Sequence, residues 1–255
     1  MATPLADAAW IERDGALRRS TYEERPAPPA CRDVVACVWE GVAGWNRELR
    51  VLPDGCVDIA WDGTAVTVTP AADAVRRVPV LAGRTTVGVR LRPVAAGAVL
   101  GSLAGELRTP TALRDAWGVD AAERLEQALV ESPAEAVVVR LVDRVVQHAR
   151  GRMPDHRLDA ALEELARPWS MVGDAADAAG WSVRQFRRQC VANVGLAPKP
   201  LQHVLRFRRA LRSLGTQPLA RVAAEHGYAD QAHLTRAVRR HAAATPGELA
   251  ARMAR

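Results

Sequence analysis

The chain has 255 residues, of which 49% are hydrophobic and 25% are charged, so it is long enough for one or two domains with buried cores. No window approaches the ~18 consecutive apolar residues of a membrane span. Residues 1–15 lack the basic start and apolar run of a signal peptide. The four cysteines follow no CxxC spacing, so we expect reduced thiols. These features predict a cytoplasmic protein that has no membrane partner.

Positive charge is concentrated in the C-terminal part of the chain. Residues 1–154 hold 19 basic and 20 acidic residues, whereas residues 155–255 hold 16 basic and 9 acidic residues. Between Ser182 and His241 there are 12 basic residues against 2 acidic ones. This asymmetry is typical of a nucleic-acid-binding domain joined to a neutral one, although a solvated basic helix face would give the same pattern.

Residues 30–92 have the pattern of short strands separated by turns. The turn Pro53-Asp54-Gly55 precedes residues 57–61, in which large apolar side chains alternate with smaller or polar ones. Residues 65–69 and 87–91 show the same alternation, and a period of two is typical of half-buried strands. The sequence therefore predicts a small β-sandwich or barrel in this region.

After Pro93 the apolar period becomes helical. The helix expected after Pro133 carries a wide apolar stripe, formed by Val137, Val138, Leu141, Val142, Val145 and Val146. This stripe needs cover, and we expect the same helix of a second chain, which would make a homodimer. The alternative is burial against the β-rich part of the same chain.

These patterns predict an α+β chain in three parts. Residues 1–110 are expected to form a β-rich domain and residues 111–153 a helical connector with the dimer contact. Residues 154–255 are expected to form an all-α domain, because no stretch after Asp155 reads as a strand. The boundary is placed at Gly151 to Pro154, since glycine ends helices and proline begins new segments.

Two segments of the last 100 residues have the order helix, glycine turn, capped helix. In the first, Ser170 is the expected N-cap of a short helix that ends before Gly180. Trp181 is apolar, and Ser182 is the expected N-cap of the next helix, over residues 183–193. This order is that of a helix-turn-helix unit, whose second helix enters the major groove.

The second helix of this unit is rich in arginine. Phe186 is expected to face inward, which places Arg184, Arg187 and Arg188 on one outward face. Arginine pairs bidentately with guanine, so this face suits base readout. A solvated helix face is the alternative.

The same order recurs about 48 residues later. Gly227 supplies the turn, Tyr228 takes the place of Trp181, and Asp230 takes the capping place before residues 231–240. A basic helix over residues 199–214 joins the two units and carries Arg206, Arg208, Arg209 and Arg212. Two units joined in this way could reach major grooves ~34 Å apart.

A family resemblance runs through both units. In the first half the matching residues are Ala176, Gly180, Ser182, Phe186, Arg188, Gly195 to Pro198, Arg206, Arg209, Ala210 and Leu214. In the second half they are Leu219 to Ala223, Gly227, Tyr228, Asp230 to Arg236, Thr245 and Pro246. On these residues, 158–250 resemble the C-terminal DNA-binding domain of AraC/XylS-type transcriptional regulators. The chain has Cys190, Val238 and Ala243 where that family usually has Phe, an aromatic residue and Gly.

The resemblance implies which residues contact DNA. It assigns base readout to the arginines of the first unit and to Gln231, Ala232, Thr235 and Arg236 of the second. Gln231 suits adenine and Ala232 the thymine methyl group, while helix N-termini and basic side chains suit phosphates. The predicted DNA-binding set is Ser182, Arg184, Gln185, Arg187, Arg188, Gln231, Ala232, Thr235, Arg236, Arg239 and Arg240.

The N-terminal half resembles, on fewer residues, the sensor domain of one branch of these regulators. Leu52 to Asp58 and Val87 to Pro93 are its landmarks. The resemblance implies a cupin-like domain followed by helices. The predicted effector-binding residues are Trp39, Trp61, Arg90 and Arg92, because tryptophans can line a cavity and arginines can hold an anion. Alternatively, the tryptophans are core residues, and the arginines pair with Asp54 or Asp58.

No catalytic motif is present. The chain has no G-x-S-x-G elbow, no glycine-rich phosphate loop and no histidine–carboxylate metal motif. Residues 1–147 contain no histidine, whereas a metalloenzyme of cupin type needs several. Cys31, Cys37 and Cys56 lack zinc spacing, so we expect buried thiols rather than a thiol or metal sensor. We predict no enzyme activity, no metal and no cofactor.

The sequence thus predicts a sequence-specific transcriptional regulator that binds double-stranded DNA. Its N-terminal domain is expected to bind a small-molecule effector, and RNA polymerase is a further partner if the protein activates transcription. The competing hypothesis is a DNA-binding adaptor whose N-terminal domain contacts other proteins without a ligand.

Overall fold

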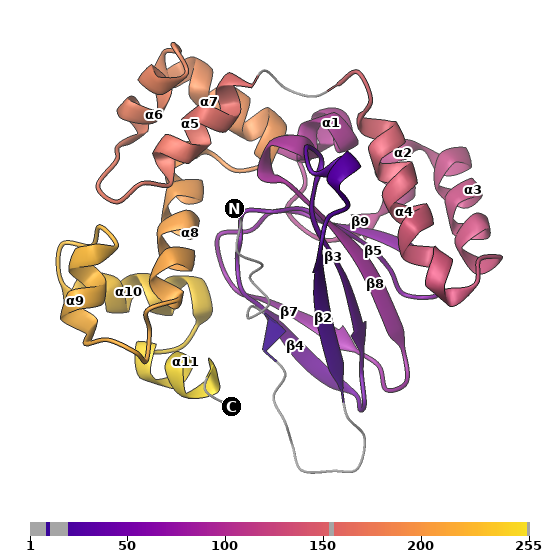
Figure 1. Ribbon diagram of the computed structural model, residues 1–255, viewed down its shortest axis with the longest axis horizontal. Helices are drawn as coiled ribbons and strands as arrows, with labels where there is room; N and C mark the ends of the chain where they lie inside the picture. Colours follow the sequence, from indigo (N-terminus) through magenta and orange to yellow (C-terminus); the bar gives the residue numbers. More distant parts are fainter. Residues whose placement is uncertain (1–8, 11–19, 153–155, 254–255) are drawn as a thin grey trace.

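The structure, a computed structural model, describes residues 9–10, 20–152 and 156–253. The boundary expected between residues 153 and 154 lies outside the described residues. Figure 1 shows a β-rich N-terminal half beside a helical C-terminal half. This arrangement confirms the predicted α+β class.

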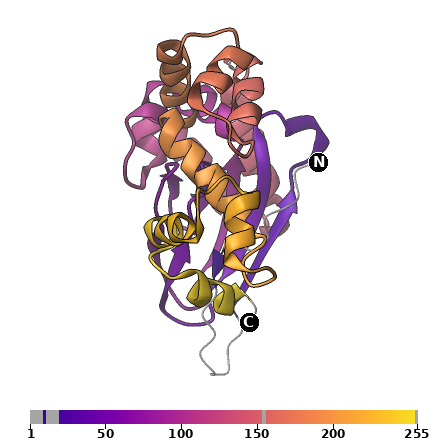
Figure 2. The ribbon, with the colours of Figure 1, turned by 90° about the vertical axis from the view of Figure 1, so that its left-hand side faces the viewer.

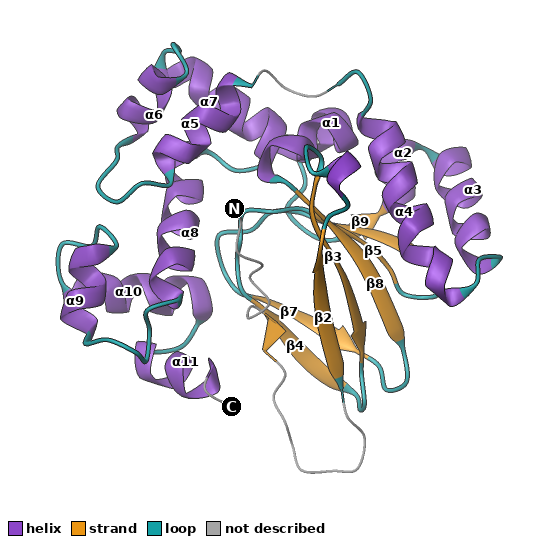
Figure 3. Ribbon diagram, viewed as in Figure 1, coloured by secondary structure: helices purple, strands orange, loops and turns teal. Residues whose placement is uncertain are grey.

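Short antiparallel strands build the N-terminal half. One sheet has the order β1-β4-β7, with β1 (Ala9–Trp10), β4 (Arg47–Val51) and β7 (Arg76–Val80). The other has the order β2-β3-β8-β5-β6-β9. Its strands are β2 (Thr21–Pro26), β3 (Val35–Val42), β8 (Thr85–Leu91), β5 (Asp58–Trp61), β6 (Val66–Thr69) and β9 (Thr111–Ala112). In Figure 3 these strands, in orange, have helices on both sides.

The period-two alternation decides which side chains of the larger sheet enter the core. Ile59 of β5 lies opposite Val68 of β6, Trp61 lies opposite Val66, and all four are buried. The intervening residues of β5 and β6 are less buried, as the alternation predicted.

Helices follow the strands and close one side of the larger sheet. They are α1 (Ala96–Leu100), α2 (Leu113–Trp117), α3 (Val119–Val130) and α4 (Ala134–Ala149). Short 3-10 segments are η1 (Pro29–Cys31), η2 (Pro93–Ala95) and η3 (Gly101–Gly105).

The apolar stripe of α4 is buried by its own chain. Leu141, Val142 and Val145 share a hydrophobic core with Val89 and Leu91 of β8. The rest of the stripe, Val137, Val138 and Val146, packs against the margin of this core. Burial within one chain therefore accounts for the stripe, which gives no support to the predicted homodimer. The segment predicted as a connector belongs to the core of the N-terminal domain.

The C-terminal half is helical in its described residues. Its helices are α5 (Arg157–Leu165), α6 (Val172–Ala178), α7 (Val183–Val194), α8 (Pro198–Leu211), α9 (Leu219–Glu225), α10 (Gln231–Ala242) and α11 (Pro246–Met253). The pairs α6–α7 and α9–α10 are the two predicted helix-turn-helix units, and α8 runs between them (Figure 2). Helix α8 contributes Leu201 to the core of the first unit and Phe207 to that of the second.

The prediction that Ser170 caps α6 is wrong. Met171 occupies the N-cap position, and the Asp174 carboxylate accepts a hydrogen bond from Met171 N (2.8 Å). Ser170 is buried, and its carbonyl oxygen accepts a hydrogen bond from Gln202 of α8 (2.6 Å). Ser170 therefore ties the first unit to α8 instead of capping a helix.

The two halves pack closely against each other. The C-terminal end of α7 lies against α1, η2 and η3. A Cβ at Gly97 of α1 would lie 2.5 Å from the carbonyl oxygen of Ala192, so only glycine permits this approach. Leu52 joins the core of the second unit and Val94 that of the first. The N-terminal domain thus extends both cores of the C-terminal half.

Val142→Glu tests whether the stripe is buried within one chain. The new carboxylate would enter the core between α4 and the sheet, so we expect the free energy of unfolding to fall by at least ~3 kcal/mol. Val139→Glu is the control, because Val139 lies on the same helix and is 60% exposed. Urea unfolding and sedimentation velocity measure both variants. A dimeric wild type and a stable, folded Val142→Glu monomer would instead support pairing between chains.

Candidate nucleic-acid interface

The first recognition helix, α7, begins at a reciprocal cap. Ser182 Oγ accepts a hydrogen bond from Gln185 N (3.2 Å), and Gln185 Oε1 accepts one from Ser182 N (2.9 Å). This arrangement satisfies two N–H groups at the start of the helix. It confirms the predicted cap, and it leaves only the NH₂ group of the Gln185 side chain for DNA.

Three arginines of α7 face water. Arg184, Arg187 and Arg188 are exposed and form no ion pair with a described residue. Phe186 is fully buried in the core of the first unit, as predicted. Because a guanidinium group is always charged and presents several N–H donors, this face can bind phosphates or guanine edges.

The turns of the two units have the same geometry. Gly180 and Gly227 have φ values of +65° and +76°, a region that favours glycine. The next residue of each unit donates its backbone N–H back to the preceding helix, Trp181 to Ala176 and Tyr228 to Ala223, both at 2.9 Å. Both aromatic side chains are buried. The predicted repeat is therefore confirmed at its turns.

The second recognition helix, α10, begins at the predicted cap Asp230. Its Oδ1 accepts a hydrogen bond from His233 N (2.6 Å). Gln231, Ala232 and Arg236 are exposed on this helix. Thr235 is half-buried, and its hydroxyl donates to the Gln231 carbonyl (2.9 Å), so this hydroxyl is already used within the helix.

The C-terminal end of α10 touches the N-terminal domain. Arg240 Nη2 lies 2.9 Å from Asp73 Oδ2, and His241 Nδ1 lies 2.5 Å from the Asp73 carbonyl oxygen. Arg50 of β4 also donates a hydrogen bond to the carbonyl oxygen of Ala242. Burial lowers the pKa of His241, which favours the neutral imidazole in this contact. Arg239, in contrast, is exposed and has no ion-pair partner among the described residues.

The three departures from the family pattern lie at two buried core positions and at the left-handed end of α10. Cys190 and Val238 are fully buried, so each fills a core position with a smaller side chain than the family's. Ala243 has a φ of +47° at the end of α10, which is the region that favours glycine. The chain therefore keeps a left-handed C-cap on α10 although alanine is unfavourable in this conformation.

The four predicted effector residues do not gather around one cavity. Trp61 lies in the hydrophobic core, 6% exposed, and Trp39 Nε1 donates to Asp58 Oδ1 (2.9 Å). Arg90 is buried among carboxylates, and Arg92 Nη2 lies 2.5 Å from Asp159 Oδ1 of α5. In this structure Trp61 is therefore a core residue, and Arg90 is paired with aspartates. These are the alternative roles given for them in the sequence analysis.

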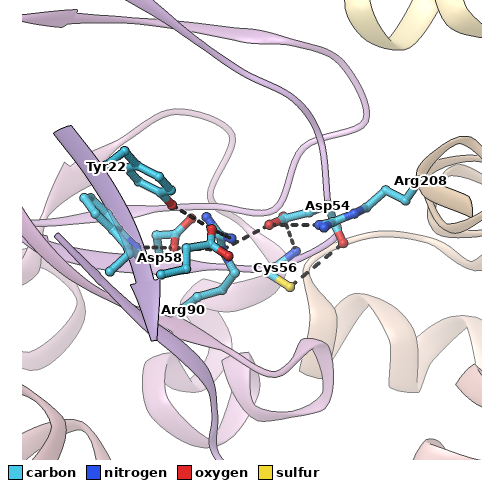
Figure 4. Close-up of polar contacts among 8 residues, drawn as sticks. Tyr22, Asp54, Cys56, Asp58, Arg90 and Arg208 are labelled. Carbon is cyan, nitrogen blue, oxygen red and sulfur yellow. Dashed lines mark hydrogen bonds and ion pairs between the residues drawn. The ribbon is translucent and has the colours of Figure 1, made fainter. Parts of the chain in front are cut away.

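A buried cluster of charges lies where the larger sheet meets α8 (Figure 4). Arg90 Nη1 is 2.7 Å from Glu24 Oε1, and Arg90 Nε is 3.1 Å from both Asp54 Oδ2 and Asp58 Oδ1. From the other half of the molecule, Arg208 Nη1 is 3.3 Å from Asp54 Oδ2. Each of these side chains is at most 13% exposed.

The pKa values of Asp54 and Asp58 are shifted in opposite directions by their surroundings. Burial by itself raises the pKa of Asp54, but Arg90 and Arg208 outweigh it and hold that pKa below the ordinary value. Burial also raises the pKa of Asp58, and there the charge of Asp54 adds to it, so its pKa is raised. Asp54 is therefore the ionised partner of Arg208. Removing one partner of a buried ion pair costs ~3–5 kcal/mol, because the other charge is left unpaired.

Sequence reasoning missed the contacts between the halves. It named Asp54 only as a turn residue and as an alternative partner of Arg90, and it gave Arg208 only as one arginine of a basic helix. The pairs Asp54–Arg208 and Asp73–Arg240 join residues more than 150 positions apart. A charged residue at an otherwise apolar helix position, as Arg208 is on α8 between Val204 and Leu211, was the available signal.

A cleft of about 200 Å³ lies between η2, α5 and α8. Its lining is largely apolar and includes Val94, Leu162 and Leu205. Arg92 and Asp159, which form an ion pair across the two halves, also line it. Of the predicted effector residues, Arg92 is thus the one that borders this cleft.

The cysteines lack the features of reactive thiols. Burial raises the pKa of Cys37 and of Cys190 to about 12, and it raises the pKa of Cys56 well above the ordinary value. A thiol is nucleophilic as its thiolate, so these groups are poor nucleophiles at neutral pH. In the described part of the chain, no His, Cys, Asp and Glu side chains are grouped as a metal site, and no helix is long and apolar enough to span a membrane.

Two family models match parts of the chain. Residues 175–252 match a helix-turn-helix domain, and residues 23–112 match a family described as a domain of unknown function. No curated protein matches. The first match spans both recognition helices and the helix α8 that joins them.

Solved structures resemble the chain weakly. The crystal structure of ToxT from Vibrio cholerae O395 is 10% identical, with a TM-score of 0.43 over 85% of this chain and 96% of that one. An unsaturated fatty acid bound wild-type ToxT from Vibrio cholerae strain SCE256 is 9% identical, with a TM-score of 0.37 over 93% of this chain and 96% of that one. Similarity at this level is too low to transfer a ligand or a binding site.

The capped recognition helices, the exposed arginines of α7 and the matching helix-turn-helix model all indicate DNA binding. The C-terminal half is a DNA-binding domain built from two helix-turn-helix units.

Arg188→Ala and Arg236→Ala test base readout by the two helices separately. If each arginine pairs with a guanine, each variant should lose ~1–3 kcal/mol of discrimination at one base pair of the site. Arg221→Ala is the control, because Arg221 is exposed on α9 and pairs with Glu225 of the same helix. Affinities for single-base variants of a selected duplex measure the change. Unaltered base preference in both variants would remove these arginines from the readout set.

Proposed function

We propose that this chain, whose C-terminal half is an AraC-type helix-turn-helix domain, regulates transcription by placing α7 and α10 in successive major grooves of one DNA duplex. The observation that carries the proposal is the pair of exposed, capped recognition helices at the two ends of α8. The 14 residues of α8 span ~21 Å at 1.5 Å per residue. With the flanking helices added, the two units suit grooves ~34 Å apart.

The salt dependence of DNA binding tests this function. The full chain should bind duplex DNA, and the logarithm of its affinity should fall steeply and linearly with the logarithm of salt concentration, because several phosphates are neutralised and counterions are released. Fluorescence anisotropy with a labelled duplex, between 50 and 200 mM salt, measures the slope. Affinity that barely changes over this range, or preferential binding to single strands, would contradict the proposal.

The N-terminal domain is proposed to control the DNA-binding domain through its docked position. It contacts the C-terminal ends of both recognition helices, and its Asp54 holds the buried Arg208 of α8. The N-terminal ends of the recognition helices stay exposed in this arrangement. A change in docking would therefore alter the positions of both helices, although the docked domain does not cover their base-reading ends.

A small-molecule effector would act at the cleft between η2, α5 and α8. Residues of both halves line it, so a ligand there contacts the two domains at once and changes the free energy of docking. Arg92 is the predicted effector residue that borders it. An adaptor without a ligand, contact with RNA polymerase and a homodimer remain predictions with no specific contact behind them.

Arg208→Gln tests whether the buried ion pair couples the domains. Asp54 keeps Arg90 as a partner in this variant, so the N-terminal domain retains its own pairing while the interface loses its buried charge pair. We expect wild type to melt in one calorimetric transition and Arg208→Gln in two. Arg84→Gln is the matched control, because it removes one arginine from a partly exposed pair with Asp62 inside the N-terminal domain.

A single transition in Arg208→Gln, shifted no further than in Arg84→Gln, would contradict coupling through this pair. Two transitions in wild type would show that the domains are not coupled at all.

A further inference from the structure

The second recognition helix ends in a backbone conformation that is unfavourable for its residue. Helix α10 ends at Ala242, and Ala243 follows as the C-cap with φ +47° and ψ +41°. This left-handed conformation costs an alanine free energy that a glycine does not lose, because the alanine Cβ crowds the backbone. Helix α7 also has a left-handed C-cap, but there the residue is Gly195, with φ +86°. Of the two recognition helices, α7 therefore ends without this strain and α10 does not.

The last carbonyl group of α10 has no acceptor role along the helix. In an α-helix the carbonyl oxygen of one residue accepts a hydrogen bond from the N–H four residues later. For Ala242 that residue is Pro246, which has no backbone N–H. The final carbonyl groups of a helix also carry partial negative charge, so a cation placed beside them stabilises the helix end. The Ala242 carbonyl thus needs a donor from elsewhere, and a cationic donor suits it best.

Arg50 of the N-terminal domain supplies this donor. Its Nη2 donates a hydrogen bond to the Ala242 carbonyl oxygen and lies 3.4 Å from the Ala243 carbonyl oxygen. Arg50 belongs to β4, the middle strand of the sheet β1-β4-β7, so its backbone is paired on both sides. The guanidinium group therefore reaches α10 from a fixed position in the other domain.

Arg50 differs from the other contacts at this end of α10 in what it binds. Asp73 binds side chains of the last turn, with its carboxylate 2.9 Å from Arg240 Nη2 and its carbonyl oxygen 2.5 Å from His241 Nδ1. Arg50 instead binds the backbone on both sides of the junction between Ala242 and Ala243. It is thus the contact that acts directly on the conformation in which the helix ends.

We propose that Arg50 is a positioning residue for the second recognition helix, which it caps from the other domain and whose unfavourable end at Ala243 it stabilises. While the N-terminal domain is docked, the last turn of α10 is held. When the domain moves away, the guanidinium leaves with it and the last turn loosens. Helix α7 keeps its glycine cap, so the loss of Arg50 weakens DNA readout by α10 and spares readout by α7. The inference rests on the proposed function and names a contact through which docking acts on one half of the DNA site.

Amide hydrogen exchange in the full chain tests the cap without DNA. Arg50→Gln should speed exchange in the last turn of α10 by roughly 3- to 10-fold, the range expected from losing a cation at a helix C-terminus. The last turn of α7 should exchange at its wild-type rate. Arg50→Lys, which keeps a cation and N–H donors, should retain most of the protection. Adding Ala243→Gly to Arg50→Gln should restore much of it, because glycine adopts the left-handed cap without strain.

Unchanged exchange in Arg50→Gln would overturn the cap, as would faster exchange that Ala243→Gly does not correct. Arg77→Gln is the matched control. Arg77 lies opposite Arg50 in the same sheet, but it is paired with Glu48 (3.1 Å), so its loss removes the same charge from the sheet and leaves the α10 contact in place. An effect of Arg77→Gln on α10 as large as that of Arg50→Gln would show that charge alone is responsible and would overturn the proposal. Thermal melting checks that each variant is folded.

Base discrimination on a selected duplex tests the positioning role. Arg50→Gln should lower discrimination in the half of the site bound by α10 and retain it in the half bound by α7, and Ala243→Gly should reverse the loss. Equal losses in both halves, or no loss in either, would overturn the positioning role. A wild type that does not bind duplex DNA would overturn the proposed function, and the exchange measurement would still decide whether Arg50 caps α10.

Discussion

The buried pair of Arg208 and Asp54 constrains the relation between the two halves of the molecule. A guanidinium group taken out of water needs a carboxylate beside it, and the carboxylate within reach of Arg208 belongs to the other domain. Asp54 is in turn held ionised by Arg90, which Glu24 and Asp58 surround. The orientation of α8, and with it the positions of both helix-turn-helix units, therefore depends on a charge cluster inside the N-terminal domain.

Helix α8 contacts both helix-turn-helix units and the N-terminal domain. Leu201 and Phe207 pack into the cores of the two units, so α8 sets the distance between the recognition helices. Arg208 faces the N-terminal domain, and Arg206 lies against the turn of the second unit, with its guanidinium over the Tyr228 ring. A rigid element that meets both DNA-reading units and the controlling domain can transmit docking to DNA binding without a separate linker.

The docked arrangement leaves most of the DNA-facing surface open. At the start of α7 and of α10, the exposed side chains form no ion pair with a described residue that a phosphate or base would have to displace. Arg240 is the exception, since Asp73 already neutralises it. Its contribution to phosphate binding therefore depends on whether this pair opens, which makes Arg240 the residue of the predicted set most sensitive to docking.

Local features of this molecule could be predicted from the sequence, and long-range contacts could not. The caps Ser182 and Asp230, the turns at Gly180 and Gly227 and the inward Phe186 follow from backbone and side-chain preferences within a few residues. Ser170 was misassigned because its role depends on Gln202, which lies on another helix. For Trp61 and Arg90 the sequence leaves both a ligand contact and a structural role open, because composition cannot distinguish a cavity from a packed core or a buried ion pair. The apolar stripe on α4 predicts that this face of the helix is buried. It does not show whether the same chain or a second chain buries it, so the expected dimer surface could not be distinguished from intramolecular packing.

Footprinting by hydroxyl radicals, with the full chain on a duplex selected from a random library, tests the central claim most directly. If α7 and α10 enter successive major grooves, two protected patches should lie on one face of the duplex, about 10 base pairs apart. Arg188→Ala should weaken protection in one patch and Arg236→Ala in the other. A single patch, or two patches on opposite faces of the duplex, would contradict the account.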